Sequence, residues 1–288
     1  MAPLMRANRA STTAKMVALW RTLADDGVTT VPGFADPYAA QLLDERFGRL
    51  LRFFRWRLGR STSARDRMMR TLDIIAMRVA TIDAALADAI AAGCRQVVIL
   101  GAGLDTRAWR LDVVAGLPLY EVDHPATQAE KRKRAQALPP PKADVHWTTV
   151  DFAKEALAQR LEAVGHQLAT PTAWIWEGDV MYLDDVAVRG SLAAVRARSA
   201  AGSVLILHYH EPSATALQRG ARHLLLSWLG EPQIGTRSRH AMRDMVERAG
   251  FVVVEDLGLA EQAAKVGGVA TDGDLARVSR ILVARVVD

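Results

Sequence analysis

The segment VVILGAGLDTRAWRL, residues 97–111, carries the strongest structural signal in this sequence. Together with Gln96, its apolar and β-branched beginning is typical of a buried parallel strand. The strand is expected to end at Gly101. Glycine there and at Gly103 allows a sharp turn and a close approach between the backbone and a ligand. Because ligands of open α/β sheets bind beyond the carboxyl ends of the strands, this turn is the first candidate for a binding site.

Strand-like and helix-like segments alternate along the rest of the sequence. The strand-like segments are 96–100, 118–123, 144–150, 172–177, 203–209, 251–256 and 279–287. The helical segments between them are 125–137, 153–164, 185–199 and 238–249. This alternation predicts an α/β fold with a doubly wound, seven-stranded, mostly parallel sheet and helices on both faces. Acidic and Gly-rich sequence without an obvious helix separates the last two strands, which are expected to form an antiparallel edge pair.

The first 92 residues are predicted to be helical. Ser11 is a candidate cap for a helix that extends to Leu23, and a breaker-rich loop follows at 27–37. A second helix begins near Tyr38, and a third ends at Gly93. We therefore predict a single domain over residues 1–288, with a helical cap (1–92), a core (93–288) and a substrate lid (210–245).

Composition limits the classes of protein that this chain can represent. Of its 288 residues, 50% are hydrophobic and 24% are charged, which favours a folded domain over a disordered chain. The single Cys94 excludes an intrachain disulfide and a metal site built from cysteines. The histidines are scattered, so no metal is expected. No apolar run is long enough to span a bilayer, and the basic beginning lacks the apolar part of a secretory signal, so we expect a cytoplasmic protein.

The residue pattern around the first strand predicts the kind of cofactor. Asp123 lies 20 residues after Gly103, at the end of the next strand, where a carboxylate can accept both ribose hydroxyls of an adenosine. A dinucleotide fingerprint would need glycine in place of Thr106, and Asp105 puts a negative charge where a pyrophosphate would bind. An adenosine cofactor without phosphates, S-adenosylmethionine, fits better. The alternative is that Gly101 and Gly103 only make a tight turn.

Several motifs in order resemble one family. GCRQVVILGAGLDTRAWRL (93–111), followed by YEVDHPATQAEKRKR (120–134), is similar to the leucine carboxyl methyltransferase family of S-adenosylmethionine-dependent methyltransferases. STTAKM, FADPYA, RVATID, VDF and PTAWIWEGDVMYL add to the match. AGFVVVEDLG resembles the bacterial small-molecule branch, whose tetracenomycin-type members methylate polyketide carboxylates. The resemblance implies a Rossmann-like class I methyltransferase fold.

The resemblance also implies a set of cofactor contacts. Arg78 matches the arginine that meets the methionine carboxylate, and Asp123 matches the acid that binds the ribose. The other matching positions are Gly101 with Gly103 in the turn, Asp151 and Phe152 beside the adenine, and Glu177 after the fourth strand. Phe152 departs from the leucine that is typical there. Taken alone, Asp151 could be a helix cap and Glu177 a charge at a strand end.

The acceptor side is less defined by the sequence. His208 and His210 follow the fifth strand, and strand alternation places them on the same side of the sheet. Either could be a general base or a structural histidine. Tyr182 and Arg237 are further candidates, and Arg237 could pair bidentately with a substrate carboxylate.

The segment 46–70 combines nine arginines with Phe53, Phe54 and Trp56. It could bind RNA or an anionic membrane, but an amphipathic helix with its rings in the core or lid and its arginines in water is favoured. Likewise, 131–134 is interpreted as a solvated helix end. We therefore expect neither a nucleic acid nor a membrane partner.

The expected activity is O-methylation of a small-molecule carboxylate, with S-adenosylhomocysteine as the second product and a role in secondary metabolism. One alternative is methylation of a phenol, hydroxyl or amine with His208 or His210 as the base. Another is a protein-directed carboxyl methyltransferase or a binding module without activity.

Overall fold

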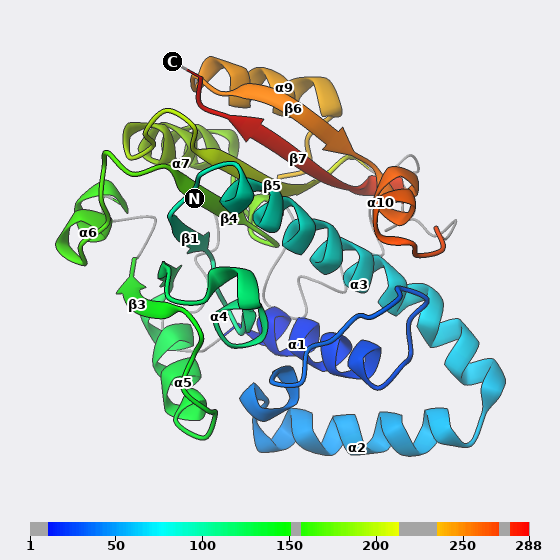
Figure 1. Cartoon of the computed structure of the whole chain (residues 1–288). Helices are drawn as coiled ribbons and strands as arrows, with labels where there is room; N and C mark the ends of the chain where they lie inside the picture. The colour runs from blue at the N-terminus through cyan, green and yellow to red at the C-terminus, as the bar shows by residue number, and fades with distance from the viewer. Residues whose placement is uncertain (1–10, 151–156, 213–234, 271–276, 288) are drawn as a thin grey trace.

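The apolar segment before Gly101 forms a central strand of a seven-stranded sheet (Figure 1). The computed structural model describes residues 11–150, 157–212, 235–270 and 277–287. Their sheet has the order β3-β2-β1-β4-β5-β7-β6, in which the neighbours from β3 to β5 are parallel and β7 is antiparallel to both β5 and β6. The strands are β1 (Gln96–Leu100), β2 (Pro118–Asp123), β3 (Asp144–Thr149), β4 (Thr172–Trp176), β5 (Val204–His210), β6 (Val252–Leu257) and β7 (Ser279–Arg285).

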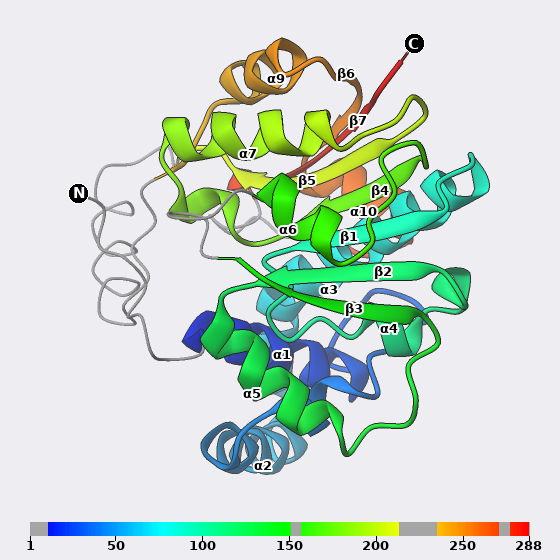
Figure 2. The same ribbon diagram turned by 90° about the vertical axis from the view of Figure 1, so that its left-hand side faces the viewer.

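The described helices cover both faces of this sheet. Their bounds are α1 (Thr12–Asp25), η1 (Ala39–Leu42), α2 (Glu45–Gly59), α3 (Thr62–Ala91), α4 (Arg107–Arg110), η2 (Asp112–Val114), α5 (Pro125–Ala135), α6 (Leu157–Ala163), η3 (Val180–Tyr182), α7 (Asp185–Ala197), α9 (Arg239–Arg248) and α10 (Leu259–Val266). In Figure 2, α6 and α7 lie in front of the sheet and α3 lies behind it. Of the described helices, none is long and apolar enough to cross a membrane.

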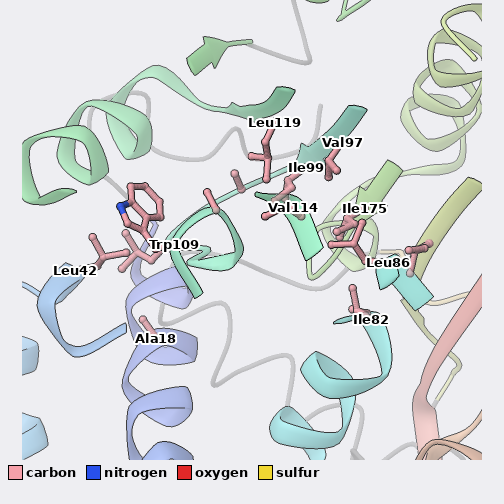
Figure 3. Close-up of a cluster of buried hydrophobic side chains, with 14 of the residues drawn as sticks. Ala18, Leu42, Ile82, Leu86, Val97, Ile99, Trp109, Val114, Leu119 and Ile175 are labelled. Carbon is pink, nitrogen blue, oxygen red and sulfur yellow. The ribbon is translucent and has the colours of Figure 1, made fainter. Parts of the chain in front are cut away.

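Alternation along the strands builds two separate cores. Val97 and Ile99 of β1 point to the face covered by α3, where they meet Ile82 of that helix and Ile175 of β4 (Figure 3). The intervening residues of the strands point to the opposite face, covered by α6, α7 and α9. Trp174 is among the fully buried side chains there. The period of two in the strands therefore explains why both faces are apolar, as expected for a parallel sheet between helical layers.

The predicted antiparallel pairing at the end of the chain is confirmed, with two refinements. β7 inserts between β5 and β6, so of the last two strands only β6 lies at an edge of the sheet. The sequence between them also contains a helix that was not predicted, α10. It begins after Gly258 and ends at Gly267, whose positive φ of 75° is typical of a helix C-terminus. Leu259 and Ala263 of α10 are buried against Met77 of α3, so tertiary packing supports this short helix.

The helical N-terminal region follows the prediction at its start and differs further along. Ser11 caps α1, because its Oγ accepts a hydrogen bond of 3.0 Å from the backbone N of Ala14. On α2, Phe47 is buried, but the rings of Phe53 and Trp56 are 52% and 55% exposed. The expectation that the rings of this helix meet the core or a lid was therefore wrong for these two residues. They lie on the side of α2 that faces away from the core.

Candidate functional site

The glycine turn after β1 is held by the carboxylate at the end of β2. Gly101 and Gly103 have positive φ angles of 65° and 49°, which residues with a side chain rarely adopt. The backbone N of Gly103 donates to Oδ2 of Asp123, and the backbone N of His124 donates to Oδ1 at 2.5 Å. The first and second strands thus end at a shared hydrogen-bonded corner. The sequence spacing had placed the glycine turn and Asp123 at the ends of these strands but had not indicated the hydrogen bond between them.

The Asp123 carboxylate is buried at this corner, with 9% of the residue exposed. Burial raises its pKa above the ordinary value, and the hydrogen bonds from Gly103 and His124 oppose that rise. Each backbone N–H occupies one lone pair, which leaves each oxygen able to accept one more hydrogen bond. This geometry matches two adjacent hydroxyl donors, such as those of a ribose.

Asp179, which the sequence analysis did not single out, lies directly over Gly101. A Cβ placed on Gly101 would come within 1.4 Å of its Oδ2. A residue with a side chain would therefore collide with Asp179 as well as adopt a strained backbone conformation. Only its position two residues after Glu177, beyond the end of β4, could have indicated that Asp179 lies at the site.

We expect Gly101→Ala to weaken S-adenosylmethionine binding by about tenfold or more, because strain of about 1–2 kcal/mol adds to displacement of Asp179. Gly116→Ala is the matched control, since Gly116 has φ of 71° but open space where a Cβ would stand. Titration calorimetry of both variants separates the two effects. Equal affinity of the two variants would show that the contact with Asp179 is irrelevant.

Glu177 and Arg78 meet across the top of the sheet. Nε of Arg78 donates to Oε1 of Glu177 at 2.7 Å, although the two residues are 99 positions apart. Within the described residues, the terminal nitrogens of Arg78 have no hydrogen-bond partner, while the residue is 7% exposed. Glu177 thus fixes the orientation of a guanidinium that retains donors for a carboxylate, such as that of a bound methionine group.

Arg107 joins this pair to a buried ionic cluster. Its guanidinium contacts Asp83 at 2.7 Å, Glu177 at 2.9 Å and also Asp105, and the side chain is 1% exposed. Burial alone would lower the pKa of Arg107, but the three carboxylates raise it well above the ordinary value. Asp105 therefore holds an arginine. Its charge therefore faces the cluster and not the ligand side, where its place in the sequence had suggested it.

The cluster extends to the N-terminal helices. Arg110 contacts Asp83 at 2.6 Å, and Arg21 of α1 contacts Asp36 at 3.2 Å and donates to the carbonyl of Leu104 at 2.5 Å. The hydrogen bond from Arg21 to Leu104 thus connects the N-terminal helical region with the backbone just after the glycine turn. The members are four guanidinium groups and four carboxylates: Arg21, Arg78, Arg107, Arg110, Asp36, Asp83, Asp105 and Glu177.

The cluster predicts a loss of stability in acid. Burial alone would raise the pKa of Glu177, but Arg107, Arg78 and Arg21 lower it to about 2 from 4.5. The resulting stability, on the order of 3 kcal/mol, is complete above pH 4.5 and is lost as the pH falls toward 2. We expect urea unfolding to show wild type and Glu177→Gln converging in stability as the pH falls through this range. A constant difference would contradict the pairing.

The interpretation of 131–134 as a solvated helix end is wrong for Lys131. This side chain is 1% exposed and forms an ion pair with Glu121, which is buried in β2. Its ammonium also lies 5.8 Å and 5.6 Å from the ring centroids of Trp109 and Trp147. Burial raises the pKa of Glu121 to about 7, while Lys131 acts in the opposite direction. Glu121, which offsets the cost of burying Lys131, lies on another element. The run of charges at 131–134 alone therefore does not indicate that Lys131 is buried.

His208 and His210 lie on the same side of the sheet, as alternation predicted. Their ring centroids are 5.0 Å apart. His208 is fully buried and its Nε2 lies 3.2 Å from Oγ of Ser279 in β7, while His210 is 7% exposed. Both histidines are thus surrounded by the fold.

Arg237 is engaged in structural contacts. Its Nε donates to Asp185 at 2.9 Å, its Nη atoms donate to carbonyl oxygens that include those of Gly235 and Leu183 at 2.8 Å, and the residue is 5% exposed. These contacts do not favour its predicted role as a clamp for a substrate carboxylate. Tyr182, in η3, is partly buried.

Part of the predicted site lies outside the described residues, namely Asp151, Phe152 and positions 213–234 of the predicted lid. The C-terminal part of that lid forms α9, whose Met242 and Val246 are buried in the core beneath it. Among the described residues, no group of three or more His, Cys, Asp or Glu side chains could hold a metal ion.

Comparison with known proteins shows that the chain is an S-adenosylmethionine-dependent methyltransferase. A protein of that named class from Mycolicibacterium smegmatis is 36% identical over 222 residues, covering 74% of this chain and 70% of that protein. A second, from Mycolicibacterium paratuberculosis, is 37% identical over 224 residues, covering 75% and 71%. The cofactor is S-adenosylmethionine. The corner fits it, because each oxygen of the Asp123 carboxylate accepts one backbone hydrogen bond and retains an acceptor for a ribose hydroxyl.

The chain belongs to the leucine carboxyl methyltransferase family, whose model matches residues 14–196. Two crystal structures share the fold over nearly the whole chain. The structure of a protein from Thermobifida fusca assigned to the methyltransferases has a TM-score of 0.60 at 15% identity, covering 99% of this chain and 98% of that one. The structure of a DUF574 family protein from Streptomyces avermitilis also has a TM-score of 0.60, at 16% identity, and the match covers 96% of this chain and 98% of that one.

Proposed function

We propose that this methyltransferase forms a methyl ester on the carboxylate of a small molecule, in secondary metabolism. The observation that carries the proposal is the packing of the candidate bases inside the fold: His208 is fully buried with its Nε2 3.2 Å from Oγ of Ser279, and its ring lies against that of His210 with centroids 5.0 Å apart. A phenol or hydroxyl must lose a proton when it is methylated, and therefore benefits from a base within hydrogen-bond reach. A carboxylate, with an ordinary pKa of about 4, is already ionised at neutral pH. An acceptor that needs no base suits this site better.

In this proposal the protein's own residues bind and orient the reactants. When bound, S-adenosylmethionine supplies an electrophilic methyl group on a positively charged sulfur. Asp123 would accept hydrogen bonds from the ribose hydroxyls, and Arg78, oriented by Glu177, would bind the carboxylate of the methionine part. Rigid placement of these groups lowers the entropic cost of bringing the methyl carbon in line with the acceptor oxygen.

Charge balance distinguishes the acceptors. A carboxylate oxygen forms a bond to the methyl carbon as the bond between that carbon and sulfur breaks. The acceptor loses its negative charge and the sulfur loses its positive charge, so no proton is released. A hydroxyl or phenol acceptor instead releases one proton for each methyl group transferred.

The test is a screen of small carboxylic acids with methyl-labelled S-adenosylmethionine. We expect label in a small product that alkali releases as methanol, and no acidification of a weakly buffered reaction. Alkali-stable label accompanied by proton release would identify an ether and contradict the proposal. Label on a protein band would identify a protein carboxylate as the acceptor and would also contradict it.

A further inference from the structure

The outer face of α2 is exposed and unlike the rest of the helix. Phe47, Leu51 and Leu58 point into the core, whereas Phe53 and Trp56 on the opposite side are 52% and 55% exposed. The two exposed rings are neighbours, with centroids 6.0 Å apart. Figure 1 shows α2 at the margin of the molecule, on the far side of α1 from the sheet. These rings form an apolar patch on an outward-facing helix surface.

Arginines surround the two rings. The exposed charged residues of this face are Glu45, Arg46, Arg49, Arg52, Arg57 and Arg60. The single carboxylate, Glu45, lies 3.6 Å from Arg49, but both side chains are more than half exposed, so the pair is weak. Four guanidinium groups on α2 and a fifth on Arg60, which follows its last residue, are a large concentration of charge in a chain whose formal net charge is +5. The face therefore presents aromatic rings inside a strongly positive rim.

We propose that the outer face of α2, defined by these arginines with Phe53 and Trp56, docks on the surface of a bilayer that contains anionic phospholipids. The rings would enter the boundary between headgroups and acyl chains, and the guanidinium groups would bind lipid phosphates. Helices that lie in this interface have an aromatic or aliphatic face and a basic rim. The attachment is peripheral and does not depend on the identity of the methyl acceptor. It replaces the expectation from the sequence that this segment has no membrane partner, because the rings of Phe53 and Trp56 are exposed instead of buried.

The charge and the ring geometry of this face favour an anionic bilayer over a second copy of the chain and over a single-stranded nucleic acid. A second copy of the chain docking through the same face would bring the two arginine sets together, at a cost in repulsion. A single-stranded nucleic acid would need ring faces open for base stacking. The guanidinium carbon of Arg60 lies over the ring of Trp56, 5.4 Å from its centroid, and the Phe53 and Trp56 rings are inclined by 36°. The inclination of the two rings and the guanidinium group over Trp56 therefore leave no flat ring surface on which a base could stack.

The test is co-sedimentation of the full-length protein with vesicles of phosphatidylglycerol and phosphatidylcholine, compared with phosphatidylcholine alone. We expect binding only to the anionic vesicles, weakened by salt. Phe53→Ser with Trp56→Ser, and Arg49→Gln with Arg60→Gln, should each reduce the bound fraction about tenfold or more at limiting lipid. The matched controls, Leu168→Ser with Val186→Ser and Arg189→Gln with Arg248→Gln, change similar exposed residues elsewhere and should bind as wild type does.

Trp56 also provides a direct optical readout. Brominated lipids should quench part of the tryptophan fluorescence of the wild-type protein, and Trp56→Phe should remove that part while retaining vesicle binding. The proposal is overturned if anionic vesicles are not bound at low salt. It is also overturned if the serine pair binds like wild type, or if single-stranded nucleic acid binds more tightly than vesicles and depends on the same two rings.

Discussion

Asp123→Ala should raise the dissociation constant for S-adenosylmethionine by about a hundredfold or more, because two hydrogen bonds to a charged group are each worth about 1.5–3 kcal/mol. The variant removes the proposed ribose acceptors and also releases the backbone N–H groups of Gly103 and His124. Titration calorimetry measures the change in affinity. Asp123→Asn should bind with intermediate affinity, since one of its two positions can still accept a hydrogen bond.

Asp112→Ala is the matched control for this measurement. Its carboxylate is 94% exposed and pairs only with Lys142 among the described residues, so wild-type affinity is expected. Thermal unfolding of each variant separates a local loss of binding from a loss of folding. Wild-type affinity in a folded Asp123→Ala protein would show that the ribose is held elsewhere.

Arg107→Met should lower the free energy of unfolding by about 3–5 kcal/mol, the range for removing one partner from a buried ionic group. The substitution leaves Asp83, Asp105 and Glu177 facing one another without their shared cation. Urea unfolding followed by circular dichroism measures the effect. Arg107→Lys retains the positive charge but cannot contact all three carboxylates in the same way, so a smaller loss is expected.

The control for Arg107 is Arg67→Met on α3, where the side chain is exposed. Surface substitutions of this kind usually change stability by less than about 0.5 kcal/mol. If Arg107→Met were no less stable than Arg67→Met, the ionic cluster would have no net effect on folding. The proposed cofactor contacts of Arg78 and Asp123 would still stand.

The sheet could be predicted because its signal is local. The central strands β1, β4 and β5 are short apolar runs, and spacers of helix length between strands imply parallel pairing. The positions of the glycine turn and of Asp123 could be predicted for the same reason, since the turn follows β1 and Asp123 ends the adjacent strand β2. The bounds of α7 and α9 also agree with the sequence pattern to within two residues.

The ionic cluster could not be predicted, because its partners are far apart in sequence. Arg78 and Glu177 are brought together only when α3 covers the end of β4, and Arg21 reaches the turn from α1. A charged residue in a sequence is exposed by default, and only its partners make burial tolerable. The exposed rings of Phe53 and Trp56 are the reverse case, in which apolar residues remain outside because none of the described elements packs against that side of α2.

The position of β7 has a consequence for synthesis of the protein. β5 pairs with β7, so the outer edge of residues 204–210 has no native partner until residues 279–285 have left the ribosome. An apolar strand with an unpaired edge can pair with other chains, and a nascent chain exposes such an edge until its partner strand has been synthesised. The strand order therefore leaves this edge open to mispairing while residues 211–278 are being synthesised.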